Sequence, residues 1–141
     1  MKLEKYTERA RGFIQSSQSR ALAAKHHYFT PEHLLNELLE DQDGFASNLV
    51  CASGGDSETV KQSVRGELAR LPKVDGGDGI SQLFLTPESA RLFESAEQLA
   101  GEKGDHFVTA ECLLLALAMA SGTPSERMLK AAGVTVTGLE A

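Results

Sequence analysis

The 141-residue sequence predicts an all-α fold built from two pseudo-symmetric four-helix repeats, about eight helices in all. Three observations predict it: a segment that recurs in register, apolar residues at helical spacing behind threonine caps, and no strand pattern of any length. Residues 30–35, TPEHLL, return as residues 109–114, TAECLL, an offset of 109 − 30 = 79. This internal duplication indicates two similar units related by a pseudo-two-fold axis.

The same offset aligns positions far to either side of this segment. It pairs residues that caps, cores and helix ends require, such as Thr7 with Thr86, Leu38 with Leu117 and Gly54 with Gly133. A chance match would not keep one register over such different roles. We expect one domain over 1–141, with repeat one at about 1–71, a connector at about 72–85 and repeat two at about 86–141.

Helix boundaries in the first half follow from start and stop signals. Thr30 caps a helix whose first residue, Pro31, lacks only an N–H that the first turn leaves unpaired anyway. Gly54 supplies the left-handed backbone that closes the third helix. The helices expected in this half cover about 7–25, 30–43, 45–52 and 57–71.

The second half repeats this order after the connector. Pro72 and the glycines that follow it predict a loop, and residues 80–85 are expected to be extended. Thr86 and Thr109 cap helices, and Gly133 closes one. The helices expected here cover about 86–103, 109–119, 125–132 and 137–141.

Composition and charge argue against nucleic-acid-binding, membrane-spanning and secreted proteins. The net charge is −6 and no Lys/Arg block occurs, so the sequence gives no indication of a nucleic-acid partner. The longest apolar run, about residues 113–120, falls short of the roughly 20 residues that span a membrane. The charged N-terminus does not resemble a signal peptide. We expect a cytoplasmic protein in which Cys51 and Cys112 are buried free thiols.

The residue pattern offers no catalytic, cofactor or metal site. No Gly-x-x-x-x-Gly-Lys-Ser/Thr phosphate loop is present, so this chain is not expected to bind ATP or act as an enzyme. The four histidines lack the convergent partners of a zinc site, and Cys112 on a leucine-rich helix is expected to be inert packing. An enzyme that uses histidine or cysteine is the alternative, which a metal assay and thiol labelling would test.

Several segments carry a family resemblance that covers essentially the whole chain. They are YTERA at 6–10, His27 with FTPEHLL at 29–35, LPKV at 71–74, GDHFV at 104–108 and KAAGV at 130–134. The layout resembles the Clp amino-terminal repeat domain, which precedes the AAA+ rings of Clp ATPases. The LPKV connector and its glycine-rich continuation most resemble the ClpB disaggregase branch.

The resemblance implies a function for a fragment of a larger protein. The chain would capture unfolded or aggregated polypeptides, and hexameric rings of the same parent, using ATP and Mg²⁺ that this fragment does not bind, would thread them. The alternative within the family is a domain of the ClpA/ClpC type that docks an adaptor for a protease.

The resemblance also implies candidate client-binding residues. Thr7, Asp105 and Glu111 match polar positions tied to client handling, although Thr7 could serve only as a cap and Asp105 only as a loop residue. Glu32 and Glu111 match glutamates that recognise phosphorylated arginine in ClpC-like relatives, which suggests binding of basic groups. An acid in a first helical turn also stabilises the helix by roughly 0.3–1 kcal/mol without any ligand.

An apolar client groove is expected where the first helix meets the second repeat. Leu92, Phe93 and Cys112 are its candidates from matching positions. The alternative is that they are core residues, because apolar residues at helical spacing usually are. Positions that differ between the repeats, such as His33 and Cys112, mark where the second copy could have become a binding surface.

Overall fold

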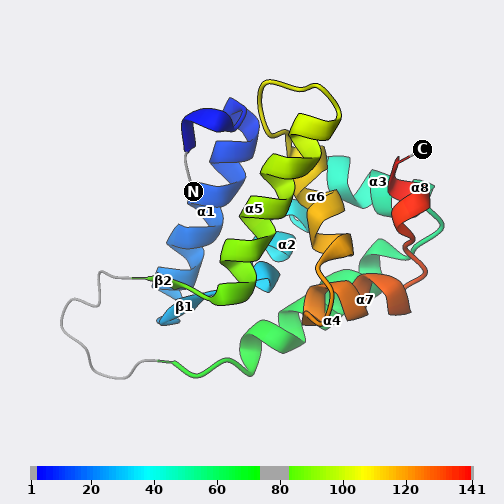
Figure 1. Ribbon diagram of the computed structural model, residues 1–141. Coiled ribbons are helices and arrows are strands. Elements are labelled where there is room, and N and C mark those ends of the chain that lie inside the picture. The colour runs from blue at the N-terminus through cyan, green and yellow to red at the C-terminus, as the bar shows by residue number, and fades with distance from the viewer. Residues whose placement is uncertain (1–2, 74–82, 141) are drawn as a thin grey trace.

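The computed structural model describes residues 3–73 and 83–140 and confirms the all-α class (Figure 1). Eight α-helices, one short 3-10 helix and one pair of two-residue strands form the described part of the chain. The elements are η1 (Leu3–Lys5), α1 (Glu8–Ala23), β1 (Tyr28–Phe29), α2 (Pro31–Leu39), α3 (Phe45–Ala52), α4 (Ser57–Ala69), β2 (Phe84–Leu85), α5 (Pro87–Glu102), α6 (Ala110–Met119), α7 (Pro124–Ala131) and α8 (Val136–Glu140).

Threonine caps start most of these helices, as the sequence predicts. The Thr7, Thr86 and Thr109 hydroxyls each accept a hydrogen bond from the amide three residues on, which satisfies an unpaired N–H of the first turn. The start of α7 differs from the prediction: it begins at Pro124, one residue earlier, because Thr123 is a further cap. Helix α1 ends at Ala23 because Lys25 takes a left-handed conformation, with φ of 63°.

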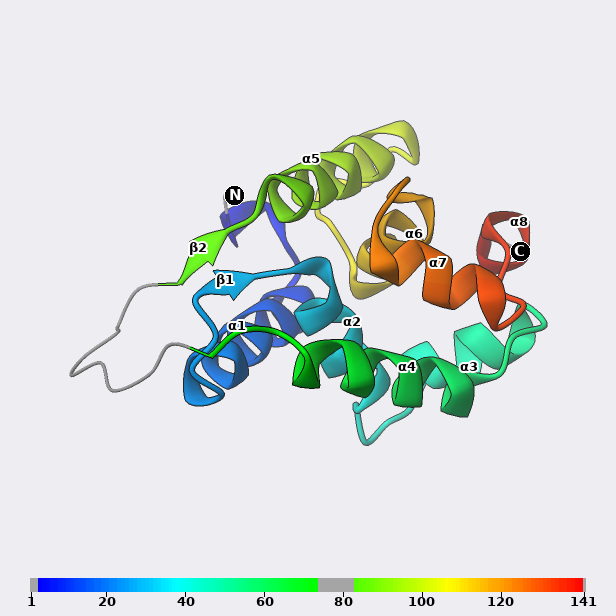
Figure 2. The same ribbon diagram turned by 90° about the horizontal axis from the view of Figure 1, so that it is seen from below.

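Two short parallel contacts tie the repeats together. In one, β1 pairs with β2, with Phe29 opposite Leu85; in the other, Tyr6 pairs with Val108. These are the same contact under the 79-residue offset, since Phe29 corresponds to Val108 and Leu85 to Tyr6. Figure 2 shows β1 and β2 side by side at one end of the molecule, with α3 and α8 at the other. The segment before the first helix of each repeat thus docks before the second helix of the other.

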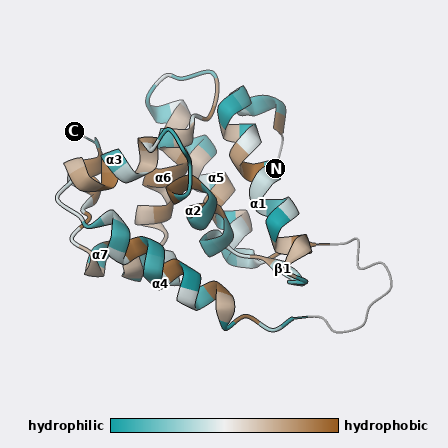
Figure 3. Cartoon of the chain, turned by 180° about the vertical axis from the view of Figure 1, so that it is seen from behind, coloured by the Kyte–Doolittle hydropathy of each residue, from teal (hydrophilic) through white to brown (hydrophobic). Residues whose placement is uncertain are grey.

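The core lies around α2 and α6, the two leucine-rich helices. Residues 112–117 of α6 are all buried, and four leucines of α2 are buried as well. Figure 3 shows hydrophobic residues gathered at α6, whereas hydrophilic and hydrophobic residues alternate along the outer helix α4. Burial of an aliphatic side chain contributes about 1.5–3 kcal/mol, so these two helices carry much of the stability.

The two symmetry-related glycines meet where the repeats join. Gly54 and Gly133 both have positive φ, 98° and 93°, and a Cβ placed on Gly133 would lie 3.1 Å from the carbonyl oxygen of Gly54. Asp56 also donates its N–H to the Ala132 carbonyl, at 3.0 Å. Glycine here serves both the turn and a close backbone approach.

The structure also corrects the expected end of the second helix, since α2 ends at Leu39 rather than near 43, and the expected burial of Cys51; part of another expectation lies outside its range. Cys112 is buried, but Cys51 is exposed, because it lies on the outward face of the short helix α3. Residues 74–82 of the connector, including most of the stretch expected to be extended, lie outside the described residues; the last two residues of that stretch form β2. No helix of the described part has both the length and the hydrophobicity of a membrane span.

Candidate functional site

A group of exposed aromatic and aliphatic side chains lies on the β1–β2 pair. Tyr28 is 54% exposed, Phe84 44% and Leu85 40%, although large apolar side chains of the chain are mostly buried. His27 packs between the two aromatic rings, with centroid distances of 4.9 Å to Tyr28 and 5.0 Å to Phe84. We call these four residues the aromatic surface. Exposed apolar groups that cluster in this way are typical of an interaction site.

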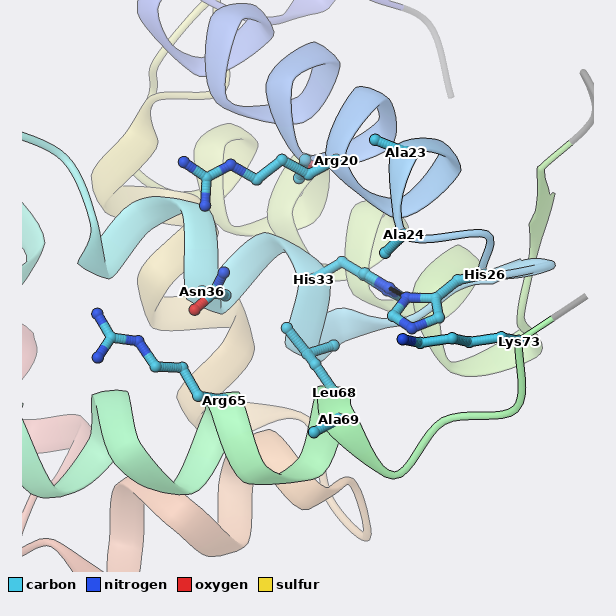
Figure 4. Close-up of a pocket in the computed structure, with 11 residues that line it drawn as sticks. Arg20, Ala23, Ala24, His26, His33, Asn36, Arg65, Leu68, Ala69 and Lys73 are labelled. Carbon is cyan, nitrogen blue, oxygen red and sulfur yellow. Dashed lines mark hydrogen bonds between the residues drawn. The ribbon is translucent and has the colours of Figure 1, made fainter.

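Two concave pockets adjoin the aromatic surface. The smaller, about 330 Å³, is lined by His27, Tyr28, Thr30, Leu71 and Pro72 together with His26 and Lys73. The larger, about 470 Å³, lies between the end of α1, α2 and α4 (Figure 4). His26 and Lys73 line both pockets, and their backbones form an antiparallel bridge. The smaller pocket therefore shares His27 and Tyr28 with the aromatic surface, and His26 and Lys73 with the larger pocket.

A buried histidine pair forms the boundary between the pockets. His26 Nδ1 lies 2.8 Å from His33 Nε2, and the Thr30 N–H donates to His33 Nδ1 at 2.9 Å. Since His33 Nδ1 accepts this bond, the neutral His33 carries its proton on Nε2 and donates it to His26 Nδ1. The neutral His26 then carries its own proton on Nε2. Burial, and then the nearby His26, lowers the pKa of His33 to about 4.

Charged side chains occupy the other end of the larger pocket. Arg20 Nε lies 3.2 Å from Glu37 Oε2, and both Arg20 and Arg65 pair with Glu40. In Figure 4 the two guanidinium groups lie on the Asn36 side of the pocket, away from the imidazoles, whereas the Lys73 ammonium lies beside the ring of His26. Burial and the Lys73 charge together lower the pKa of His26.

A second, smaller surface surrounds the bridge between Tyr6 and Val108. Here Thr7 donates its N–H to the Val108 carbonyl at 2.9 Å while its hydroxyl caps α1. Asp105 and Glu111 are exposed on either side of Val108. Phe107, 52% exposed, is the symmetry mate of Tyr28. The structure thus brings the three polar candidates Thr7, Asp105 and Glu111 to one end of the molecule.

The family model of the Clp repeat (R) N-terminal domain matches residues 5–132. The chain belongs to this family. Among its relatives, the chaperone protein ClpB of Brucella suis biovar 1 (strain 1330) is 48% identical over 139 residues, 99% of this chain, and that of Rhodopseudomonas palustris (strain ATCC BAA-98 / CGA009) is 44% identical over 141 residues. The chain spans 16% of the length of each.

Solved structures of other Clp N-terminal domains share the fold. The Hsp104 N-terminal domain from Candida albicans superposes with a TM-score of 0.82 at 17% identity, covering 96% of this chain and 87% of that one. The N-terminal domain of the ClpV1 ATPase from E. coli EAEC gives 0.77 at 22% identity, covering 98% and 83%. At these identities the likeness concerns the fold alone.

Three residues expected in a client groove lie in the core of this Clp N-terminal domain. Leu92, Phe93 and Cys112 are each 2% exposed or less. Tyr6 covers Phe93 edge-on, at a centroid distance of 6.2 Å, and its hydroxyl donates to Glu97 at 3.0 Å. These three side chains present no apolar surface to a client here, because all three belong to the hydrophobic core and Tyr6, from the segment before α1, covers Phe93.

The two glutamates expected to form a symmetric acidic pair have different surroundings. Glu32 is 4% exposed, and its Oε2 accepts hydrogen bonds from the Ser125 hydroxyl and amide. Glu111 is exposed. The position equivalent to Ser125 in repeat one is Ala46, which has no hydroxyl to offer Glu111. Only Glu111 is therefore accessible to a basic group of a client.

The aromatic surface and the histidine pair were not anticipated from the sequence. Tyr28 and Phe84 are 56 positions apart (84 − 28), and nothing in the local pattern indicates that they meet. The only signal was the 79-residue offset, which aligns Tyr28 with Phe107 and shows an aromatic residue two positions before each second-helix cap. Within residues 3–73 and 83–140, no three His, Cys, Asp or Glu side chains gather as metal ligands would.

Proposed function

We propose that this domain captures exposed apolar segments of unfolded or aggregated polypeptides for the AAA+ rings of a ClpB-like parent protein. The observation that carries the proposal is the aromatic surface, in which the exposed Tyr28 and Phe84 pack with His27, Leu85 is exposed next to Phe84 in β2, and His27 and Tyr28 line the smaller pocket. Membership of the Clp repeat family and 48% identity to ClpB over nearly the whole chain support the parent's class.

The geometry suits weak, unspecific capture. The aromatic surface is open rather than enclosed, and rings give contact area without demanding a particular partner sequence. Attachment to the rings would raise the local concentration of client, so low affinity suffices. In this proposal the domain itself breaks no bond; ATP and Mg²⁺ act in the parent's hexameric rings, and the domain holds no cofactor.

Titration of a permanently unfolded model polypeptide into the domain tests the proposal. Tyr28→Ser should weaken binding about twofold to twelvefold, because an aromatic contact contributes about 0.5–1.5 kcal/mol. Phe107→Ser is the matched control, since Phe107 is the equally exposed symmetry mate on the other surface.

Three results would overturn parts of the proposal. A larger loss in Phe107→Ser would move capture to the surface around Thr7, Asp105 and Glu111. Equal affinity in both variants and the wild type would remove the aromatic side chains from recognition. Tight binding of a protease adaptor without binding of unfolded polypeptide would favour the ClpA/ClpC-type function instead.

A further inference from the structure

The larger pocket, about 470 Å³, has an unusual charge pattern for this acidic chain. The chain has a net charge of −6, yet none of the eleven described residues that line the pocket is Asp or Glu. Its walls are apolar, formed by Ala23, Ala24, Leu68 and Ala69. The polar part consists of the cations Arg20, Arg65 and Lys73, the imidazoles of His26 and His33, and the neutral side chains of Ser17 and Asn36. An apolar concavity with few convergent donors is the usual form of a small binding site.

The hydrogen-bond donors at one end of the pocket already have acceptors, whereas the donors at the other end, which we call the open end, face the pocket. Arg20 and Arg65 are already paired with Glu37 and Glu40, which lie outside the lining. At the other end the Lys73 ammonium lies beside His26 (Figure 4). No described residue accepts a hydrogen bond from His26 Nε2, which carries the proton in the neutral tautomer that the His33 contact selects.

We propose that this open end binds a carboxylate of the client polypeptide, with His26 Nε2–H and Lys73 Nζ as donors. The inference rests on the proposed function, because the same client would lie over the aromatic surface. That surface adjoins the smaller pocket, which shares His26 and Lys73 with the larger one. The preferred client is then an apolar segment flanked by an Asp, a Glu or a chain end. A charge-assisted hydrogen bond of this kind is stronger than a neutral one.

Two peptides with one apolar core and either a flanking Glu or a flanking Gln test the inference. Wild-type domain should bind the Glu peptide about fivefold more tightly, the effect of an accessible charge pair. Lys73→Gln should abolish this preference, and Lys73→Arg should retain it. Lys103→Gln, which removes a distant exposed cation and changes the net charge equally, should leave the preference intact.

A second readout reports on the site itself. The Lys73 charge and burial hold the pKa of His26 low, and a bound carboxylate would counter that charge. Saturation with the Glu peptide should therefore raise the NMR titration midpoint of His26, whereas the Gln peptide should not. A general electrostatic attraction to the domain would leave the midpoint unchanged.

The outcomes separate this inference from the proposed function. Equal binding of both peptides, with loss of affinity in Tyr28→Ser, would overturn the carboxylate site and leave client capture standing. A preference that survives Lys73→Gln or vanishes in Lys103→Gln would also overturn it. If acetate or phosphate alone shifts the His26 midpoint as far as the Glu peptide, the pocket is a small-anion site and the assignment to a client is wrong. Binding of neither peptide would sink both proposals.

Discussion

Glu32 Oε2 lies 2.6 Å from the Ser125 hydroxyl and 3.1 Å from the Ser125 amide, in the first turn of α7. A carboxylate of the first repeat thus accepts a hydrogen bond from a backbone N–H at the start of a helix in the second repeat. Burial raises the pKa of Glu32, and the hydrogen bonds from Ser125 oppose that rise. The contact joins the repeats through a glutamate for which the family resemblance suggested binding of basic groups.

Glu32→Ala should destabilise the domain by about 2 kcal/mol, because it leaves the buried Ser125 N–H without an acceptor. Glu32→Gln keeps an acceptor and removes a buried charge, so its free energy of unfolding at pH 7 should match or exceed that of the wild type. Urea unfolding measures both. Glu111→Ala, at the exposed symmetry mate, should destabilise the domain by no more than about 1 kcal/mol, the contribution of an exposed acid in a first helical turn. Equal losses in Glu32→Ala and Glu32→Gln would contradict this account.

Stability should rise with pH between about 5 and 7. The pKa of His33 is lowered to about 4 in the folded state, so the unfolded state binds more protons until the pH exceeds about 6.5. The stability that His33 gives as a neutral group is complete above that pH and is lost as the pH falls. The expected loss is on the order of 2 kcal/mol from pH 7 to pH 5, with His26 acting in the same direction.

Carboxyl groups with shifted pKa values also affect how stability depends on pH, in two opposite ways. Hydrogen bonds from Arg65 and Arg20 outweigh burial and lower the pKa of Glu40, and the Thr59 hydrogen bonds lower that of Asp56; both contributions disappear only below about pH 4.5. The raised pKa of Glu32 acts oppositely, since its contribution is lost as the pH rises. Unfolding of Glu32→Gln should therefore show a steeper rise, and of His33→Asn a shallower one. An unchanged slope in His33→Asn would refute the histidine origin.

Thr7→Ala tests whether Thr7 serves only as a helix cap or also contacts the client. The Thr7 hydroxyl accepts from the Ala10 amide at 3.1 Å, so its loss should cost about 1 kcal/mol. The client affinity per folded molecule should stay unchanged if capping is its only role. Thermal unfolding and peptide titration on the same samples make the comparison. A loss of affinity with unaltered stability would instead place Thr7 in the binding surface.

Gly133→Ala tests the close approach of the two repeats. The substitution combines left-handed strain, about 1–2 kcal/mol, with a Cβ 3.1 Å from the Gly54 carbonyl oxygen. Gly104→Ala is the matched control, because Gly104 has φ of 77° but nothing within 4 Å of the added atom. Gly133→Ala should lower the free energy of unfolding by at least about 1 kcal/mol more than Gly104→Ala. Equal effects would show that the contact with Gly54 is unimportant.

Local features of the fold were predictable because their causes are local. The stretch 45–52 forms the expected helix, and Thr30, Thr86 and Thr109 stand immediately before helices, since a cap requires only neighbours three residues away. The sequence at the start of α7, Thr123 followed by Pro124, has the same threonine cap, although the prediction placed this start one residue later. The candidate site was less predictable, because Tyr28, Phe84 and the His26–His33 pair depend on segments that meet only after folding.

The sequence by itself determined the helices, the duplication and the family, because spacing, caps and repeated register are properties of neighbouring residues and of one fixed offset. The tertiary structure decided which apolar and acidic residues are accessible. It buried Leu92, Phe93 and Glu32, left Tyr28 and Phe84 exposed, and set Lys73 beside His26. The physical reason is that accessibility depends on the docking of one repeat against the other, and equivalent positions in two similar repeats need not have equivalent neighbours.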